Sequence, residues 1–365
     1  MLKSLNVTNY KSLASFGLNF GKFNAIIGAN NSGKSNILDC LSFLSETCRM
    51  DISNVYRKRG GFDRILYAGE HRRGKYGAHI NIVVNVSIDT ESKRAKRRQT
   101  NEYSYAIMVD ARGIFREKLQ LVSPVQRTLI EGSEGRGKYY DDSESKEREF
   151  AYNMDTSALF NLRDLKRQKT IAEFRNELLM WRFFNFSPDA SRIAMAPVKT
   201  YEIGEKGESI SNVLHTILSE DYDRFSEVQE ALRSAVPEIE KLKSPLTRDG
   251  KTHVGIKEKQ FHYDFDHLQI SDGTIKFLAN ILTAYMPTEE APSLACFEEP
   301  ENFIHPRLIE TVADLLHNAP FQVITTTHSP TFVNYVDYAL FGFMSGAGAV
   351  GLYEGVYRTA TNPRN

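Results

Sequence analysis

The sequence is poor in cysteine, and its few cysteines form no metal-binding pattern. Cys40, Cys48 and Cys296 include no closely spaced pair of the metal-ligating type, so they predict no metal site. Cys40 and Cys296 stand among apolar residues and are expected in the core. Unpaired thiols of this kind fit a reducing compartment, and we predict a cytoplasmic protein.

The chain also lacks a long apolar run, a signal peptide and a net charge. No stretch is long and apolar enough to span a bilayer, so we expect no membrane association. The 46 basic and 46 acidic residues cancel, which excludes attraction of the whole molecule to nucleic acid and leaves that role to local patches. With 365 residues, 41% hydrophobic and 25% charged, the chain is typical of one large or two moderate globular domains.

Residues 28–36 read GANNSGKSN, which contains the pattern G-x-x-x-x-G-K-S. Glycines let backbone N–H groups turn inward around a polyphosphate. Lys34 would reach the terminal phosphates, and the Ser35 hydroxyl would bind Mg²⁺. The predicted cofactor-binding residues of the loop are Asn30, Asn31, Ser32, Gly33, Lys34, Ser35 and Asn36.

The flanks of this loop support a phosphate site. Residues 23–27 form an apolar run that predicts a buried strand, and apolar residues recur at helical spacing after Lys34. The helix would then begin at the loop, with its N-terminus toward an anion.

Two later segments each place polar residues directly after an apolar strand. Residues 293–301 read SLACFEEPE, in which Glu298 and Glu299 follow the strand. One carboxylate would serve the metal and the other would polarise an attacking water. Residues 323–330 read VITTTHSP, where His328 would meet the γ-phosphate or that water, although a lone histidine is usually structural. The predicted catalytic residues are therefore Glu299, His328 and Lys34, with Ser35 and Glu298 at the metal.

Residues 268–286, LQISDGTIKFLANILTAYM, predict a helix that begins after Ser271. Ser271 is a good N-cap, and Gly273 removes bulk from the helix start. Together with Asp272 they make a small polar helix N-terminus that could meet a phosphate, although an ordinary capped helix fits equally well.

Elsewhere the patterns predict strands at 79–89 and 102–110, edge strands within 251–265 and two strands near the C-terminus. Turns are expected at 16–17 and 20–22. Helices are expected over 156–182 and within 208–243. The polar segment 131–148 predicts a mobile excursion without regular structure.

Taken together, these motifs resemble ABC-type ATPases of the SMC/RecF class. More narrowly, the chain is similar to compact stand-alone AAA-family ATPases related to the ATPase half of OLD-family proteins. The resemblance rests on NYKSL (9–13), GANNSGKSN (28–36), SDGT (271–274), FEEPENFIHP (297–306) and TTTHSP (325–330), in this order along most of the chain.

The resemblance implies an α/β P-loop NTPase head domain of ABC/SMC type, with a mixed central sheet flanked by helices, a β-rich lobe and a helical lobe. It implies a single head over 1–365. An N-terminal lobe over about 1–120 would hold the phosphate loop, a helical lobe over about 150–285 would end in the signature helix, and about 290–365 would complete the core sheet.

The same resemblance assigns roles to particular residues. Ser271, Asp272 and Gly273 would contact the nucleotide of a partner subunit, and Lys11 and Ser12 would lie beside the nucleotide. Glu298 stands where an aspartate is usual, and His305 stands where another aspartate often couples two sites. The usual Mg²⁺-sensing glutamine has no clear counterpart. The chain stops about 35 residues after His328, so no OLD-type nuclease domain is expected to follow.

The expected function is an ATP- and Mg²⁺-dependent switch that dimerises, or forms a higher homo-oligomer, through shared nucleotide. It would control a separate effector, a nuclease or toxin, in bacterial defence or DNA maintenance. The alternative is an ATP-gated scaffold or DNA clamp with very slow turnover; a kinase or a transporter subunit fits the motifs poorly. Residues 51–98 hold twelve basic and five acidic residues, so DNA is a candidate partner through basic residues 57–98.

Overall fold

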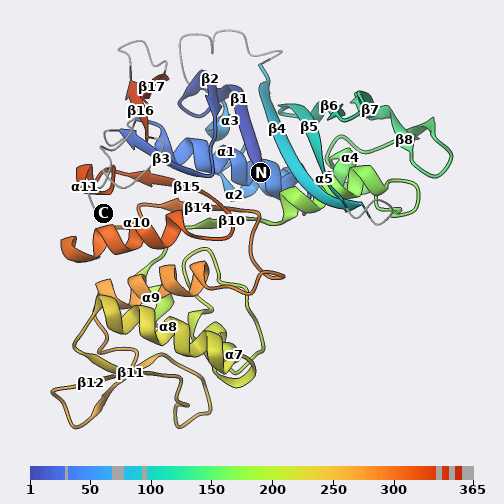
Figure 1. Cartoon of the computed structure of the whole chain (residues 1–365). Coiled ribbons are helices and arrows are strands. Elements are labelled where there is room, and N and C mark those ends of the chain that lie inside the picture. The colour runs from blue at the N-terminus through green and yellow to red at the C-terminus, as the bar shows by residue number, and fades with distance from the viewer. Residues whose placement is uncertain (29–31, 68–77, 93–96, 334–338, 345–349, 356–365) are drawn as a thin grey trace. The chain divides into compact units, whose positions relative to one another are not determined.

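The computed structural model describes residues 1–28, 32–67, 78–92, 97–333, 339–344 and 350–355 (Figure 1). The chain divides into two compact units. Unit 1 consists of Met1–Gly21, Gly28–Trp181 and Phe341–Tyr353, and unit 2 of Lys22–Ile27, Arg182–Leu340 and Glu354–Asn365.

Unit 1 is built on an eight-stranded sheet of order β2-β1-β4-β5-β6-β7-β8-β9, in which all neighbouring strands pair antiparallel. The strands are β1 (Leu2–Tyr10), β2 (Leu13–Asn19), β4 (Ile80–Ser92), β5 (Arg97–Asp110), β6 (Gly113–Ser123), β7 (Arg127–Ser133), β8 (Arg136–Asp141) and β9 (Lys146–Ala151). Alternate side chains of β4, from Ile80 to Val86, are fully buried. This period of two fixes which face of the sheet packs on the core.

The helices in the described part of unit 1 are α1 (Lys34–Thr47), α2 (Ile52–Lys58), α3 (Phe62–Ile65), α4 (Ala158–Asn161) and α5 (Lys169–Leu179). The buried face of α1 includes Ile37, Leu38, Leu41 and Leu44, as the spacing predicts. Burial of this apolar stripe explains why the helix forms here.

Unit 2 contains parallel strands that are buried on both faces. The sheet order there is β10 (Trp181–Phe184), β14 (Leu294–Glu298), β15 (Gln322–Thr327) and β3 (Phe23–Gly28). The pairs β14–β15 and β15–β3 are parallel, and all six residues of β15 are buried. Two C-terminal strands, β16 (Ala339–Met344) and β17 (Val350–Gly355), have residues in both units.

The rest of unit 2 is mainly helical. Its helices are α6 (Pro188–Ser191), α7 (Ile210–Glu220), α8 (Tyr222–Ala235), α9 (Asp272–Ala284), the 3-10 turn η2 (Pro306–Leu308), α10 (Ile309–His317) and α11 (Pro330–Val333). A small antiparallel sheet follows the order β11 (Ile239–Lys243), β12 (Gly255–Glu258) and β13 (Asp264–Phe265). Helices α7, α8 and α9 pack side by side (Figure 1). Among the described helices, none combines the length and apolar character that crossing a membrane requires.

Two sequence predictions about local structure are wrong, and a third is confirmed only in part. Segment 131–148 is not irregular, because β7, β8 and β9 run through it. Residues 16–17 lie within β2, and the turn falls instead at Lys11, whose φ of 47° lies in the left-handed region. The 156–182 stretch is helical only in α4 and α5 and ends in β10.

A half-buried ion-pair network ties α1 to its neighbours in unit 1. Asp39 of α1 lies 2.5 Å from the Lys11 ammonium and 2.9 Å from Nε of Arg59, and the Tyr10 hydroxyl donates to it over 2.6 Å. Burial would raise the pKa of Asp39, but Arg59, Lys11 and Tyr10 together outweigh burial and lower it. Arg59 also pairs with Glu46, so this member of the basic region is committed to the fold.

We predict that Asp39→Asn lowers the free energy of unfolding by about 2 kcal/mol at pH 7, because Arg59 and Lys11 lose their shared anion. Since the folded pKa lies below the unfolded value of 3.8, the stabilisation is complete above that value and is lost as the pH falls through the folded pKa. Urea unfolding at pH 7 and below pH 3.8 measures both effects. Glu131→Gln is the control, because this carboxylate is 67% exposed and 3.9 Å from Lys118. An equal loss in both variants would contradict the prediction.

Candidate functional site

The phosphate-loop motif lies at the N-terminus of α1. The helix begins at Lys34, and Gly33 before it has φ 92°, a conformation that favours glycine. Within the described residues, no side chain caps this end and its first turn holds no acidic residue. The N-terminus of a 14-residue helix in this state attracts an anion. Asn30 and Asn31 lie outside the described residues.

The polar groups beside this helix end are buried. Lys34 is 6% exposed, and its ammonium donates to the carbonyl of Gly28 over 2.8 Å. The Ser32 hydroxyl is also buried, and it finds no hydrogen-bond partner in the part of the chain that the structure describes. A buried hydroxyl without a partner is uncommon. A bound phosphate oxygen would satisfy it, so these residues fit the group that the motif predicts.

The remaining predicted residues of unit 1 are placed as follows. Ser35 is exposed at the first turn of α1, as a metal-binding hydroxyl needs to be. Asn36 donates to the Ser12 hydroxyl over 2.7 Å. Lys11 is engaged with Asp39. Both Lys11 and Ser12 therefore make bonds within unit 1 that a contact with nucleotide would have to share or replace.

In unit 2, three parallel strands end at one edge of the sheet. Glu298 of β14 stands opposite Thr326 of β15, and Thr326 stands opposite Ile26 of β3. Open α/β sheets bind ligands at the carboxyl ends of their strands. The register therefore brings Glu298, Glu299 and His328 together, as the sequence predicts, and the chain enters the phosphate loop one residue after Ile27.

Glu299 is held in a strained backbone conformation and makes two side-chain contacts. Its φ is 46°, which is uncommon outside glycine. One carboxylate oxygen pairs with His328, and the other accepts a hydrogen bond from Asn302. The neighbouring Glu298 accepts from Asn185 over 2.7 Å. The two adjacent carboxylates thus have different hydrogen-bond and ion-pair partners, as two groups with different roles would.

Glu301 is a buried carboxylate at this edge that sequence reasoning missed. Thr327 donates to its Oε1, and the His328 main-chain N–H lies 3.3 Å from the same atom. Its Oε2 is buried without a partner among the described groups. Glu301 therefore joins the ends of β14 and β15 through contacts with Thr327 and His328.

The predicted helix start at Ser271 is confirmed. The Ser271 hydroxyl accepts from the Thr274 N–H over 3.2 Å and caps α9. Asp272 pairs with Arg192, whose guanidinium also donates to the Ile270 carbonyl over 2.7 Å. A Cβ at Gly273 would lie 2.7 Å from the Phe303 carbonyl oxygen. Close packing therefore accounts for the glycine at this position without a ligand.

Lys276, also missed by sequence reasoning, is a buried lysine on α9. It is 2% exposed, and its ammonium donates to the Glu299 carbonyl over 2.9 Å. Burial lowers the pKa of Lys276 to about 8, against the opposing effect of Glu301, Glu299 and Glu298. The sequence around Lys276 gives no signal of this burial, because a solvated helix lysine would have the same context.

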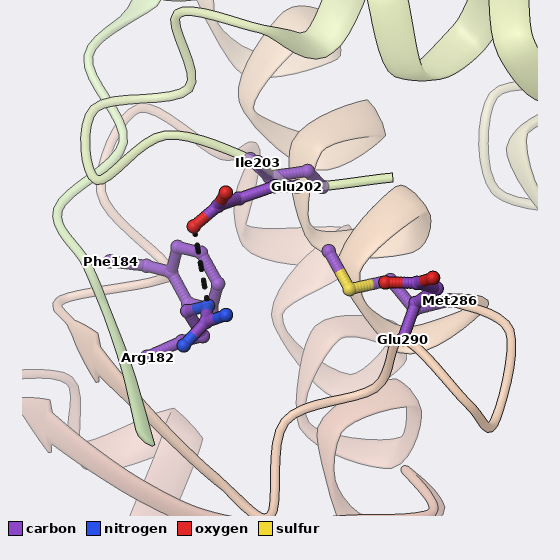
Figure 2. A pocket seen from close by; sticks show the side chains of 6 residues that line it. All are labelled: Arg182, Phe184, Glu202, Ile203, Met286 and Glu290. Carbon is purple, nitrogen blue, oxygen red and sulfur yellow. Dashed lines mark ion pairs between the residues drawn. The ribbon is translucent and has the colours of Figure 1, made fainter. Parts of the chain in front are cut away.

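A cavity in unit 2 is too small for a nucleotide. It has a volume of about 70 Å³ and is lined by Arg182, Phe184, Glu202, Ile203, Met286 and Glu290. Arg182 and Glu202 form an ion pair there, 3.7 Å apart (Figure 2). Ligand pockets usually measure about 300 Å³ or more. Within the described residues there is also no cluster of three or more His, Cys, Asp or Glu that could hold a metal by itself.

Comparison with curated proteins gives RecF proteins. The chain is 26% identical over 293 residues to the DNA replication and repair protein RecF of Phocaeicola vulgatus, a match covering 76% of this chain and 72% of that protein. It is 33% identical over 145 residues to the RecF of Porphyromonas gingivalis strain ATCC 33277, covering 39% of this chain and 38% of that one.

Among solved structures, the chain is similar to SMC head domains. An SMC head bound to the C-terminal winged-helix domain of ScpA aligns with a TM-score of 0.57 at 13% identity, over 99% of both chains. An SMC head with an extended coiled coil, bound to the C-terminal domain of ScpA derived from Pyrococcus furiosus, aligns with a TM-score of 0.51 at 13% identity, over 97% of this chain and 96% of that one. The fold is that of the ABC/SMC-type P-loop head, as the sequence predicts.

The family described as "AAA domain, putative AbiEii toxin, Type IV TA system" matches residues 23–334. This range begins at the first residue of β3 and ends one residue after α11. It includes the phosphate loop, the Ser271 helix start, the acidic pair and His328, but not Lys11 and Ser12. The chain therefore belongs to this AAA domain family, within the ABC/SMC/RecF class of ATPases.

Proposed function

We propose that this protein binds ATP with Mg²⁺, hydrolyses it, and uses the nucleotide to control self-association. The observation that carries the proposal is the edge of unit 2 where β14, β15 and β3 end, with Glu299 paired to His328. The phosphate-loop motif follows β3 directly. A general base, a second polar group and a phosphate-binding helix N-terminus are the parts that phosphoryl transfer to water needs.

Each residue set has a proposed task. Lys34, Ser32 and the N-terminus of α1 hold the phosphates. Ser35 and Glu298 hold Mg²⁺, which usually binds through few protein ligands and the substrate phosphates. When bound, the metal would neutralise charge on the phosphates.

Glu299 would orient and deprotonate the attacking water, and His328 would fix the Glu299 carboxylate and the water near it. The Ser271 end of α9, with Asp272 and Gly273, would bind the γ-phosphate held by a second copy. Because ADP lacks that phosphate, association would depend on ATP.

We also propose that the chain is one head with the three-part division expected from its sequence, and that a separate effector is its target. The family description names a toxin and a toxin–antitoxin system, and the SMC heads are bound to a second protein. A nuclease or toxin in bacterial defence or DNA maintenance fits these descriptions, and affinity purification followed by mass spectrometry would identify it.

Glu299→Gln is predicted to bind ATP, to lower turnover by about 100-fold or more, and to accumulate a dimer, since the amide cannot accept the proton of the water. Phosphate release and light scattering with ATP measure the two effects. Lys34→Ala is the control, because it should lose nucleotide binding and stay monomeric. Turnover by Glu299→Gln at the native rate would show that the base is another residue.

Ser271→Asp is predicted to separate folding from association. Aspartate is as good an N-cap as serine, so the free energy of unfolding should change by less than about 1 kcal/mol. The added negative charge would repel a γ-phosphate, and the ATP-dependent dimer should weaken at least about tenfold. Ser271→Thr, which keeps a neutral capping hydroxyl, is the matched control. A normal dimer in Ser271→Asp would rule out the phosphate role of this helix end.

DNA contact is a second proposed property, favoured by the likeness to RecF and by the basic residues within 57–98. We predict that duplex binding weakens at least about tenfold between 50 and 200 mM salt. Reversing Arg94, Lys96, Arg97 and Arg98 to glutamate should abolish it. The control reverses four exposed lysines outside this region, Lys138, Lys146, Lys199 and Lys251. Equal losses in both variants would indicate nonspecific attraction only.

A further inference from the structure

We infer that Lys276 is a positioning residue for Glu299, and that it links the Ser271 end of α9 to the carboxylate of the same chain. The inference rests on the proposed function, because it concerns the residue proposed as general base. It depends on contacts that all lie within unit 2.

One face of α9 holds the main chain of the segment Glu299–Phe303. Gly273, Lys276 and Asn280 are spaced three and four residues apart, so they lie on the same side of the helix. Gly273 packs against the Phe303 carbonyl, and Asn280 lies 3.5 Å from the Pro300 carbonyl. Lys276 stands between them and donates to the Glu299 carbonyl over 2.9 Å.

Lys276 contacts both strained residues of this segment. Glu299 has φ 46° and Phe303 has φ 67°, both in the left-handed region. Such conformations persist only where surrounding contacts over-determine them. The Lys276 ammonium binds the carbonyl of Glu299 and also lies 5.6 Å from the centre of the Phe303 ring. A cation over an aromatic ring is a favourable contact, so one group secures both ends.

The charge of Lys276 needs a reason, because an apolar residue would fill this helix face at lower cost. A buried ammonium is unfavourable unless it is paired and hydrogen-bonded. Here the three carboxylates of Glu298, Glu299 and Glu301 attract it. The lysine therefore fits the acidic segment specifically and is not a generic core residue.

The geometry gives two positions near the start of α9 different contacts. Ser271 caps its exposed N-terminus, and Lys276 lies five residues further along the same helix. A helix moves as a stiff unit over so short a distance. A shift of α9 that follows ligand contact at Ser271 would therefore move the Glu299 carbonyl, and with it the carboxylate.

The test compares Lys276→Met with Thr283→Val in the full chain. Thr283 is a buried polar residue of the same helix whose hydroxyl donates to the Ala279 carbonyl, so it controls for loss of a buried polar group. We expect Lys276→Met to lower kcat about 100-fold, as a misplaced base does. The Kd for a non-hydrolysable ATP analogue should stay within about threefold. Thr283→Val should keep native kcat.

The double variant shows whether Lys276 acts through Glu299. In a Glu299→Gln background, adding Lys276→Met should change the residual single-turnover rate less than about twofold, because coupled residues are non-additive. A native kcat in Lys276→Met, or an equal loss in both backgrounds, overturns the inference alone. A native rate in Glu299→Gln overturns the proposed base and this inference together. If Lys276→Met does not fold, Lys276→Gln replaces it under the same thresholds.

Discussion

The register of three parallel strands determines where the polar residues of unit 2 meet. Once β15 pairs with β14 on one side and β3 on the other, their carboxyl ends meet at one edge. The residues that follow cannot continue as strands there, so they turn outward with their polar groups. Glu298, Glu299 and His328 are adjacent for this reason. The burial of β15 over all six residues makes a slip of register costly, because it would move polar ends into the core.

The strained turn after β14 is the second consequence of that edge. Glu299 leaves the strand with a positive φ, and its main-chain N–H lies 3.1 Å from the Thr326 carbonyl of β15. The carboxylate can therefore project from the edge while the backbone stays bound to the sheet. Lys276 on α9 holds the Glu299 carbonyl from the other side. The position of the proposed base is thus set by a strand and a helix that are distant in sequence.

Features that depend on local chemistry could be predicted from the sequence. The strand–loop–helix around Lys34, the strands ending at Glu298 and Thr327, and the cap at Ser271 each follow from short patterns of apolar, glycine and capping residues. The strands of 131–148 could not be predicted in this way. These strands are polar in sequence, and cross-strand pairs such as Lys138 opposite Glu149 stabilise them. Such pairs are not visible in a short sequence pattern.

Residues whose role depends on tertiary contacts were also missed. Lys276 is indistinguishable in sequence from a solvated helix lysine, and only packing against the Glu299–Phe303 segment shows that it is buried. Glu301 is similar, because its partners Thr327 and His328 come from another strand. Pairings of this kind have no fixed spacing along the chain, so no short pattern can reveal them.

The contacts of Glu299 bear on when it can act. Both oxygens of its carboxylate are engaged, one by His328 and the other by Asn302. In the proposed mechanism an attacking water needs one of these oxygens as its acceptor, so it must share or displace one of the two partners. His328 and Asn302 are both exposed side chains, which makes either contact open to change by an approaching group. The proposed base is therefore fixed through its backbone and contacted through exposed side chains. Its position stays constant while its reactivity can change, which the proposed nucleotide-dependent switch requires.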